Sequence, residues 1–161
     1  MIFGLSFETF TNLHTIISLI GIATGLIVLL GMLSAKKLEG WTALFLLTTV
    51  LTSVTGFMFP RAGFTPAQGV GYVSLAVPAI ALLALYVFNL SGAWRWLYVV
   101  GAALYLNVFV GVVQSFKQIA FLQPLAPTQS EPPFIIAQTI VLVIFVVLGI
   151  LAVIRFHPQR A

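Results

Sequence analysis

The stretch LHTIISLIGIATGLIVLLGML, residues 13–33, is apolar along its whole length and carries no Lys, Arg, Asp or Glu. Residues 134–154, FIIAQTIVLVIFVVLGILAVI, have the same character. An α-helix rises ~1.5 Å per residue, so about 20 such residues cross the ~30 Å hydrocarbon layer of a bilayer. These two runs predict helices embedded in a membrane.

Three further apolar runs of similar length occupy residues 41–59, 70–88 and 97–116. Charged residues make up 6% of the 161-residue chain, whereas soluble domains carry about 25%. Five spans with short connections leave no part of the chain for a separate soluble domain. We therefore predict one domain, residues 1–161: an all-α, polytopic bundle of five transmembrane helices in contact with the lipid bilayer.

The basic residues predict the orientation of the bundle, because Lys and Arg accumulate on cytoplasmic loops. With five spans, one side of the membrane receives five of them, namely Lys36, Lys37, Arg95, Arg155 and Arg160, and the other side receives Arg61 and Lys117. We expect a plasma or inner membrane protein with the N-terminus outside and the C-terminus in the cytoplasm. The net charge of +4 is spread over loop ends, so we expect no nucleic-acid partner.

The composition disfavours several classes of activity. The chain has no cysteine, which excludes disulfides, thiolate metal sites and a cysteine nucleophile. Its two histidines, His14 and His157, fall at opposite ends of the predicted bundle, and its three acidic residues lie outside the spans. We therefore expect no haem, metal or other cofactor. Ser18 lies one turn from His14, but that helix has no acid to orient the imidazole, so we expect no enzymatic activity.

Polar side chains within the spans indicate which helix faces look inward. Asn107, Gln114 and Lys117 share one face at positions i, i+7 and i+10. Asn107 lies near the predicted bilayer centre, where an unpaired amide costs a few kcal/mol. Its partner belongs to this chain, to a neighbouring subunit or to a ligand. Lys117 either attracts an anionic ligand or extends to the lipid phosphates.

Polar residues of other spans fall in the same predicted outer half. We predict a cavity there, open to the outside, with six candidate ligand-binding residues: Asn107, Gln114, Lys117, His14, Gln138 and Thr55. The alternative is that these groups only join helices by hydrogen bonds of ~0.6 kcal/mol each. The hydroxyls of residues 48–55 bond back to carbonyls one turn earlier, pack on another helix or line water.

The longest connection and the start of the first helix each carry a prediction. We expect residues 117–133, KQIAFLQPLAPTQSEPP, to form a lid over the outer mouth, because loops of this length are usually functional covers or else disordered tethers. Ahead of the first span, we expect Thr11 or Asn12 to cap the helix.

The leading functional hypothesis is binding or translocation of a small neutral or anionic solute in the outer half. The alternative is a non-catalytic accessory or assembly subunit of a larger membrane complex. Gly21 and Gly25 form a GxxxG pair, which permits close helix packing within one chain or self-association into a homo-oligomer.

Overall fold

The computed structural model describes residues 4–59, 66–91, 93–102 and 105–156. This part of the chain is helical and contains no β-strand, so the predicted all-α class is confirmed. In chain order, the helices are α1 (Phe7–Leu33), α2 (Glu39–Phe57), α3 (Pro66–Leu82), the π-helical turn η1 (Leu83–Val87), α4 (Trp94–Ala102), α5 (Tyr105–Gln118), the 3-10 turn η2 (Gln123–Leu125) and α6 (Pro132–Arg155).

Within the described residues, α1, α2 and α6 have the length and apolar composition of membrane-spanning helices, which indicates a membrane protein. The predicted span 70–88 corresponds to most of α3 together with η1. The predicted span 97–116 is occupied by α4 and α5, and residues 103–104 between them lie outside the described part. The structure therefore supports three of the five predicted spans as single long helices.

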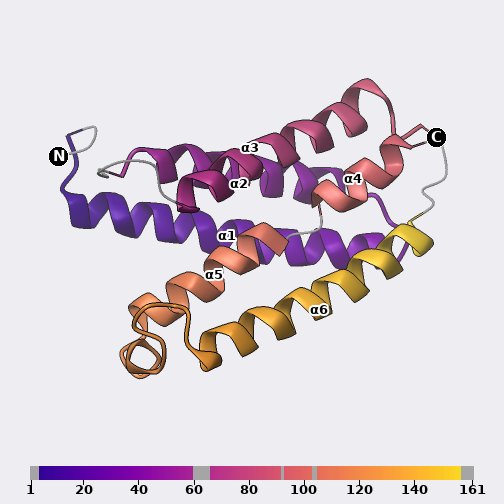
Figure 1. Cartoon of the computed structure of the whole chain (residues 1–161). Coiled ribbons are helices and arrows are strands. Elements are labelled where there is room, and N and C mark those ends of the chain that lie inside the picture. Colours follow the sequence, from indigo (N-terminus) through magenta and orange to yellow (C-terminus); the bar gives the residue numbers. More distant parts are fainter. Residues whose placement is uncertain (1–3, 60–65, 92, 103–104, 157–161) are drawn as a thin grey trace.

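The helices run up and down between two ends of the molecule (Figure 1). At one end α1 begins, α2 ends, α3 begins and α5 is joined to α6; we call this the N-terminal end. The α1–α2 turn, the start of α4 and the last turn of α6 lie at the opposite, C-terminal end (Figure 1). The connections from α1 to α2, from α2 to α3, from η1 to α4 and from α5 to α6 thus alternate between the two ends, whereas α4 ends and α5 begins between them (Figure 1).

The first helix begins earlier than predicted. Ser6 is its N-cap, and the Ser6 hydroxyl accepts a hydrogen bond of 3.1 Å from the backbone N–H of Thr9. The expectation that Thr11 or Asn12 caps this helix is therefore wrong. Because α1 starts at Phe7, the polar residues just before the apolar run lie on helix faces and not in an irregular segment.

The packed core lies at the C-terminal end. It combines α1, α2, η1, α4 and the end of α6, and it includes Met32, Phe45, Tyr98, Val99 and Phe156, each 2% exposed or less. The buried Tyr98 hydroxyl is satisfied by a 3.2 Å hydrogen bond with Thr42. Lipid is as apolar as these side chains, so close packing holds such a core together in a membrane more than expulsion of water does.

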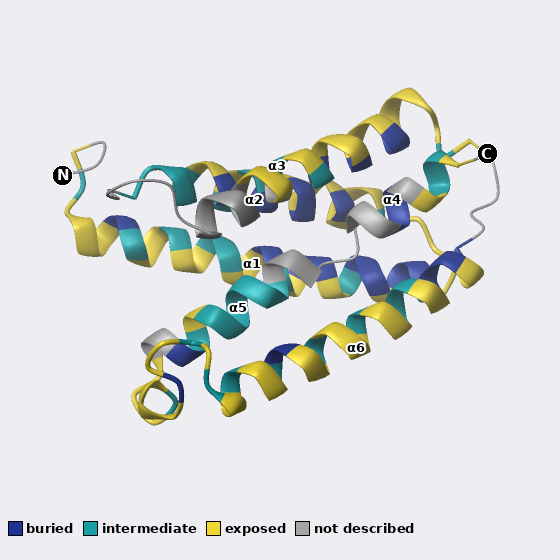
Figure 2. Cartoon of the chain, in the orientation of Figure 1, coloured by how far each residue is buried: buried dark blue, intermediate teal, exposed yellow. Residues whose placement is uncertain are grey.

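Helix α6 is the most exposed of the long helices (Figure 2). In α6 only Gln138, Ala152 and Val153 are buried. Isoleucine and valine side chains project along the rest of it, among them Ile136, Ile140, Val143, Val147, Ile150 and Ile154, all at least half exposed. Such a surface is compatible with direct contact with lipid chains.

Candidate functional site

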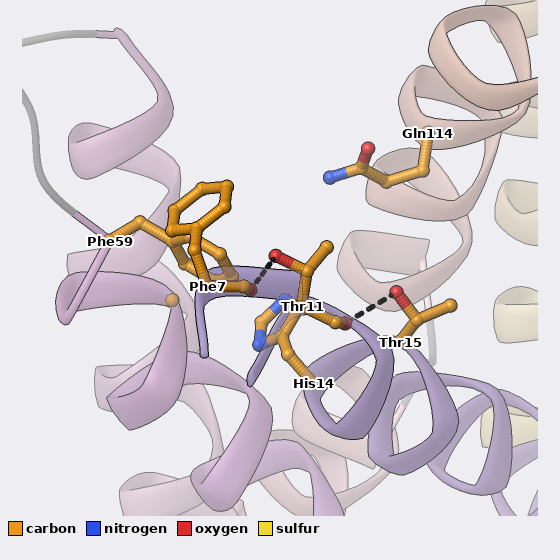
Figure 3. Close-up of a pocket in the computed structure, with 7 residues that line it drawn as sticks. Phe7, Thr11, His14, Thr15, Phe59 and Gln114 are labelled. Carbon is orange, nitrogen blue, oxygen red and sulfur yellow. Dashed lines mark hydrogen bonds between the residues drawn. The ribbon is translucent and has the colours of Figure 1, made fainter. Parts of the chain in front are cut away.

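An open cavity of about 300 Å³ lies at the N-terminal end, between the first turns of α1, the end of α2 and the last turns of α5 (Figure 3). We call it the N-terminal cavity. Among the described residues, its lining includes Phe7, Thr11, His14, Thr15, Gly56, Phe59 and Gln114. Neither an acidic residue nor a lysine or arginine occurs among these seven, so the wall combines aromatic surface with uncharged polar groups and one imidazole.

The spacing along α1 explains its contribution to the wall. Phe7, Thr11, His14 and Thr15 occupy positions i, i+4, i+7 and i+8, which share one face of an α-helix. On the opposite side, α5 crosses α1 closely at Gly111, where an added Cβ atom would lie 3.2 Å from Ile22 Cδ1. Gln114 follows less than one turn later, so this crossing brings its amide to the cavity.

Phe59 is the centre of an aromatic cluster beside the cavity. Its ring lies edge-to-face with those of Phe7, Phe10 and His14, at centroid distances of 5.8, 5.2 and 5.2 Å. Edge-to-face pairs are worth about 0.5–1.5 kcal/mol beyond their buried area. The cluster therefore joins the start of α1 to the residues that follow α2 and gives the cavity an apolar wall.

A short hydrogen bond of 2.7 Å joins His14 Nδ1 on α1 to Thr55 Oγ1 on α2. The Thr55 hydroxyl also donates to the Leu51 carbonyl oxygen at 2.7 Å. A hydroxyl has one hydrogen, so while it donates to Leu51 it accepts from His14. In that arrangement His14 Nδ1 is the donor to Thr55, and the roles of the two ring nitrogens follow the tautomer of the imidazole.

Two further hydroxyls of α2 follow the back-bonding alternative. Thr48 and Ser53 donate to the carbonyl oxygens of Leu44 and Thr49, one turn earlier, at 2.8 and 2.9 Å. Both side chains are buried. These hydroxyls are thus satisfied within their own helix, as serine and threonine often are in apolar surroundings.

Three of the six predicted site residues come together. His14 and Gln114 line the N-terminal cavity, and Thr55 contacts it through its bond to His14. The backbone of Asn107 and Lys117 lies in α5, but their side chains fall outside the described part of the structure. Their predicted roles therefore stay predictions.

Gln138 lies apart from the cavity, between α5 and α6. It is 9% exposed, and its Nε2 donates to the carbonyl oxygen of Phe109 at 3.1 Å. Within the described structure its Oε1 has no hydrogen-bond partner. Gln138 thus connects two helices and is not part of the cavity wall.

Sequence reasoning missed Phe7, Thr11, Thr15, Gly56 and Phe59. The predicted span began at residue 13, which left Phe7 outside the first helix and made Thr11 a candidate cap. A helix extended back to Ser6 places Phe7, Thr11 and Thr15 beside His14, so the helical period was the available signal. No local pattern pointed to Phe59, which depends on the contact between α1 and α2.

The described part of the loop between α5 and α6 packs against α5 and contributes no residue to the cavity lining. Gln129 Nε2 donates to the Val113 carbonyl oxygen on α5 at 3.1 Å, and Ala126 is 2% exposed. None of the described residues 119–131 belongs to the lining. Its predicted role as a lid stays a prediction.

Glu131 organises the end of this loop just before α6. Its carboxylate accepts hydrogen bonds from the Thr128 N–H, the Thr128 hydroxyl and the Ser130 N–H at 2.8–3.0 Å. Desolvation raises the pKa of this carboxyl, but these hydrogen bonds outweigh it and hold the pKa below its ordinary value. The ionised form of Glu131 therefore stabilises the loop.

Comparison of the chain with known protein families, with curated proteins and with solved structures gave no match. The functional argument therefore depends on the geometry of the N-terminal cavity.

Proposed function

We propose that this protein binds a small, uncharged solute in the N-terminal cavity, within a bundle of five transmembrane spans. The observation that carries the proposal is the meeting of His14, Thr55 and Gln114 at one cavity. These residues come from three helices, and the sequence alone predicts a polar face for each. At about 300 Å³, the cavity is at the lower end of the usual range for ligand pockets, ~300–1,000 Å³.

In this proposal the cavity faces the outer side of the membrane. The basic residues Lys36, Lys37, Arg95 and Arg155 lie at or next to the opposite end of the described helices. An excess of Lys and Arg marks the cytoplasmic side of a membrane protein. The solute would therefore enter from outside, at the level where α1 begins.

The lining favours an uncharged solute over an anion. Among the described lining residues there is no lysine or arginine that could pair with an anion. A charge without a partner is costly in apolar surroundings. The anionic solute allowed by the sequence-based hypothesis depended on Lys117, whose side chain is not among those described.

The structure also favours binding over translocation. Beyond the cavity, toward the C-terminal end, the helices close on the packed core around Met32, Phe45 and Tyr98. A solute would need those side chains to separate before it could cross. We therefore propose a binding role, such as sensing or retention of the solute.

The test uses the full-length protein in lipid nanodiscs and ligand-observed ¹⁹F NMR with 4-fluorophenol, a small uncharged aromatic probe. Saturable binding is expected above the level of empty nanodiscs. Gln114→Leu should weaken it at least several-fold, because the exposed amide is lost from the wall, whereas Gln123→Leu in the η2 turn, away from the cavity, should leave it unchanged. Equal binding by both variants, or no saturable binding to the unaltered protein, contradicts the proposal.

A further inference from the structure

We infer that the N-terminal cavity selects molecules that donate a hydrogen bond, such as a hydroxyl or N–H group on a small apolar body. This inference deepens the proposed function and rests on it. The reason is that the threonine hydroxyl hydrogens in the cavity wall are already donated to helix carbonyls.

Each threonine hydroxyl has one hydrogen to donate and two lone pairs that accept. Thr11 Oγ1 donates to the Phe7 carbonyl oxygen at 2.8 Å, and Thr15 Oγ1 donates to the Thr11 carbonyl oxygen at 2.9 Å (Figure 3). Both hydrogens are therefore directed along α1, away from the cavity. Toward a ligand, the two threonines present only acceptor lone pairs.

A ligand that can only accept can take a hydrogen bond from the Gln114 amide, but to bond to Thr11 or Thr15 as well it would have to take one of these hydroxyl hydrogens. The threonine would then lose its bond to the helix carbonyl, whereas a donating ligand leaves that bond in place. One neutral hydrogen bond corresponds to about a tenfold difference in affinity, or about 1.4 kcal/mol. The two threonines thus favour a ligand that donates a hydrogen bond over a ligand that can only accept one.

Gln114 completes the match to a hydroxyl group. Its exposed amide contains two N–H donors and one acceptor oxygen. A ligand hydroxyl can donate its hydrogen to a threonine oxygen while its own oxygen accepts from the Gln114 amide. Phe7, which is 56% exposed, and Phe59 provide apolar surface for the remainder of the molecule. Small phenols and alcohols have this combination of groups.

The decisive experiment compares 4-fluorophenol with 4-fluoroanisole, which has the same ring and an oxygen that accepts but cannot donate. Binding of each to the full-length protein in nanodiscs is measured by ¹⁹F NMR, and empty nanodiscs correct for partition into lipid. The phenol is expected to bind about tenfold more tightly. Equal or tighter binding of the anisole overturns the inference.

The double variant Thr11→Val/Thr15→Val removes both acceptor oxygens and keeps the shape of the side chains. It should bind the two probes equally, at the level of the anisole. Thr139→Val is the matched control, because Thr139 makes the same bond to a carbonyl one turn earlier, 2.8 Å from Ile135 O, on an exposed part of α6. The control should keep the full preference, and a preference that survives in the double variant refutes the inference.

The two proposals fail in different ways. If both probes bind equally and Gln114→Leu weakens both, the binding function stands and the selection of donors is refuted. If neither probe binds saturably, the proposed function fails and the inference fails with it.

Discussion

Replacement of Gln138 by leucine should leave the protein as stable as the unaltered chain, or more stable, although Gln138 is a buried polar residue between two helices. The amide is 9% exposed, donates one bond of 3.1 Å to the Phe109 carbonyl oxygen, and leaves its Oε1 without a partner in the described structure. Leucine has a similar size and requires no hydrogen bond.

The magnitude follows from two opposing terms. Loss of the interhelical hydrogen bond costs ~0.6 kcal/mol, the average value for such bonds in membranes. Removal of a buried acceptor without a partner gains about 1–3 kcal/mol. The Phe109 carbonyl lies inside α5, where helical geometry places a backbone N–H one turn later as its partner. Loss of the Gln138 bond at this carbonyl therefore adds little to the cost. The expected net effect of Gln138→Leu is a stabilisation of about 0.5–2 kcal/mol.

The assay is reversible unfolding of the full chain in bicelles, with Gln138→Ala as the comparison. The alanine variant leaves a void between α5 and α6, so it should be less stable than Gln138→Leu by about 2 kcal/mol or more. A loss of more than about 1 kcal/mol in Gln138→Leu would refute the reasoning. It would mean that Oε1 accepts a hydrogen bond from a water, a ligand or another subunit.

Three further predictions concern other contacts. A double-mutant cycle with His14→Leu and Thr55→Val should give a coupling free energy of ~0.6–1.7 kcal/mol in the same unfolding assay, and a value near zero would show that the 2.7 Å contact does not join α1 to α2. Because the pKa of Glu131 is lowered in the folded state, its stabilisation is present above the ordinary carboxyl pKa and is lost as the pH falls through the folded value. Hydrogen exchange at the Thr128 amide, corrected for its intrinsic pH dependence, should therefore lose protection in acid, and Glu131→Gln should abolish that pH dependence. Ala35 follows the end of α1 with φ 54°, where glycine avoids a steric cost, so Ala35→Gly should raise stability by about 0.5–1 kcal/mol, and a fall in the unfolding midpoint would contradict this.

Local properties of the chain follow from short stretches of its sequence. The apolar runs at 13–33 and 134–154 predict helices because their length and composition suit no other element in a membrane. The bonds of Thr48 and Ser53 to their own helix could be predicted, because each partner carbonyl lies one turn earlier in the same helix. The start of α1 was misjudged because Ser6, Thr11 and Asn12 are all good capping residues, and choosing among them depends on small local differences.

The candidate site could be predicted only in part. His14, Thr55 and Gln114 were recognisable because polar groups in apolar helices require partners at a similar depth. Depth alone did not separate Gln138 from the cavity, because that depends on how α6 is rotated against α5. Phe59 lies in the cavity wall because it contacts α1, and no sequence pattern near residue 59 predicts those contacts.

The amino-acid sequence by itself determined that this is a helical membrane protein with polar groups toward one end of its helices, because hydropathy and helical period are properties of neighbouring residues. Only the tertiary structure decided which of those groups share a cavity. The close crossing of α1 and α5 at Gly111 and the contact of α1 with α2 at His14 and Thr55 bring together residues far apart in the chain. Such crossings depend on side-chain packing between helices, which the sequence of one helix does not contain.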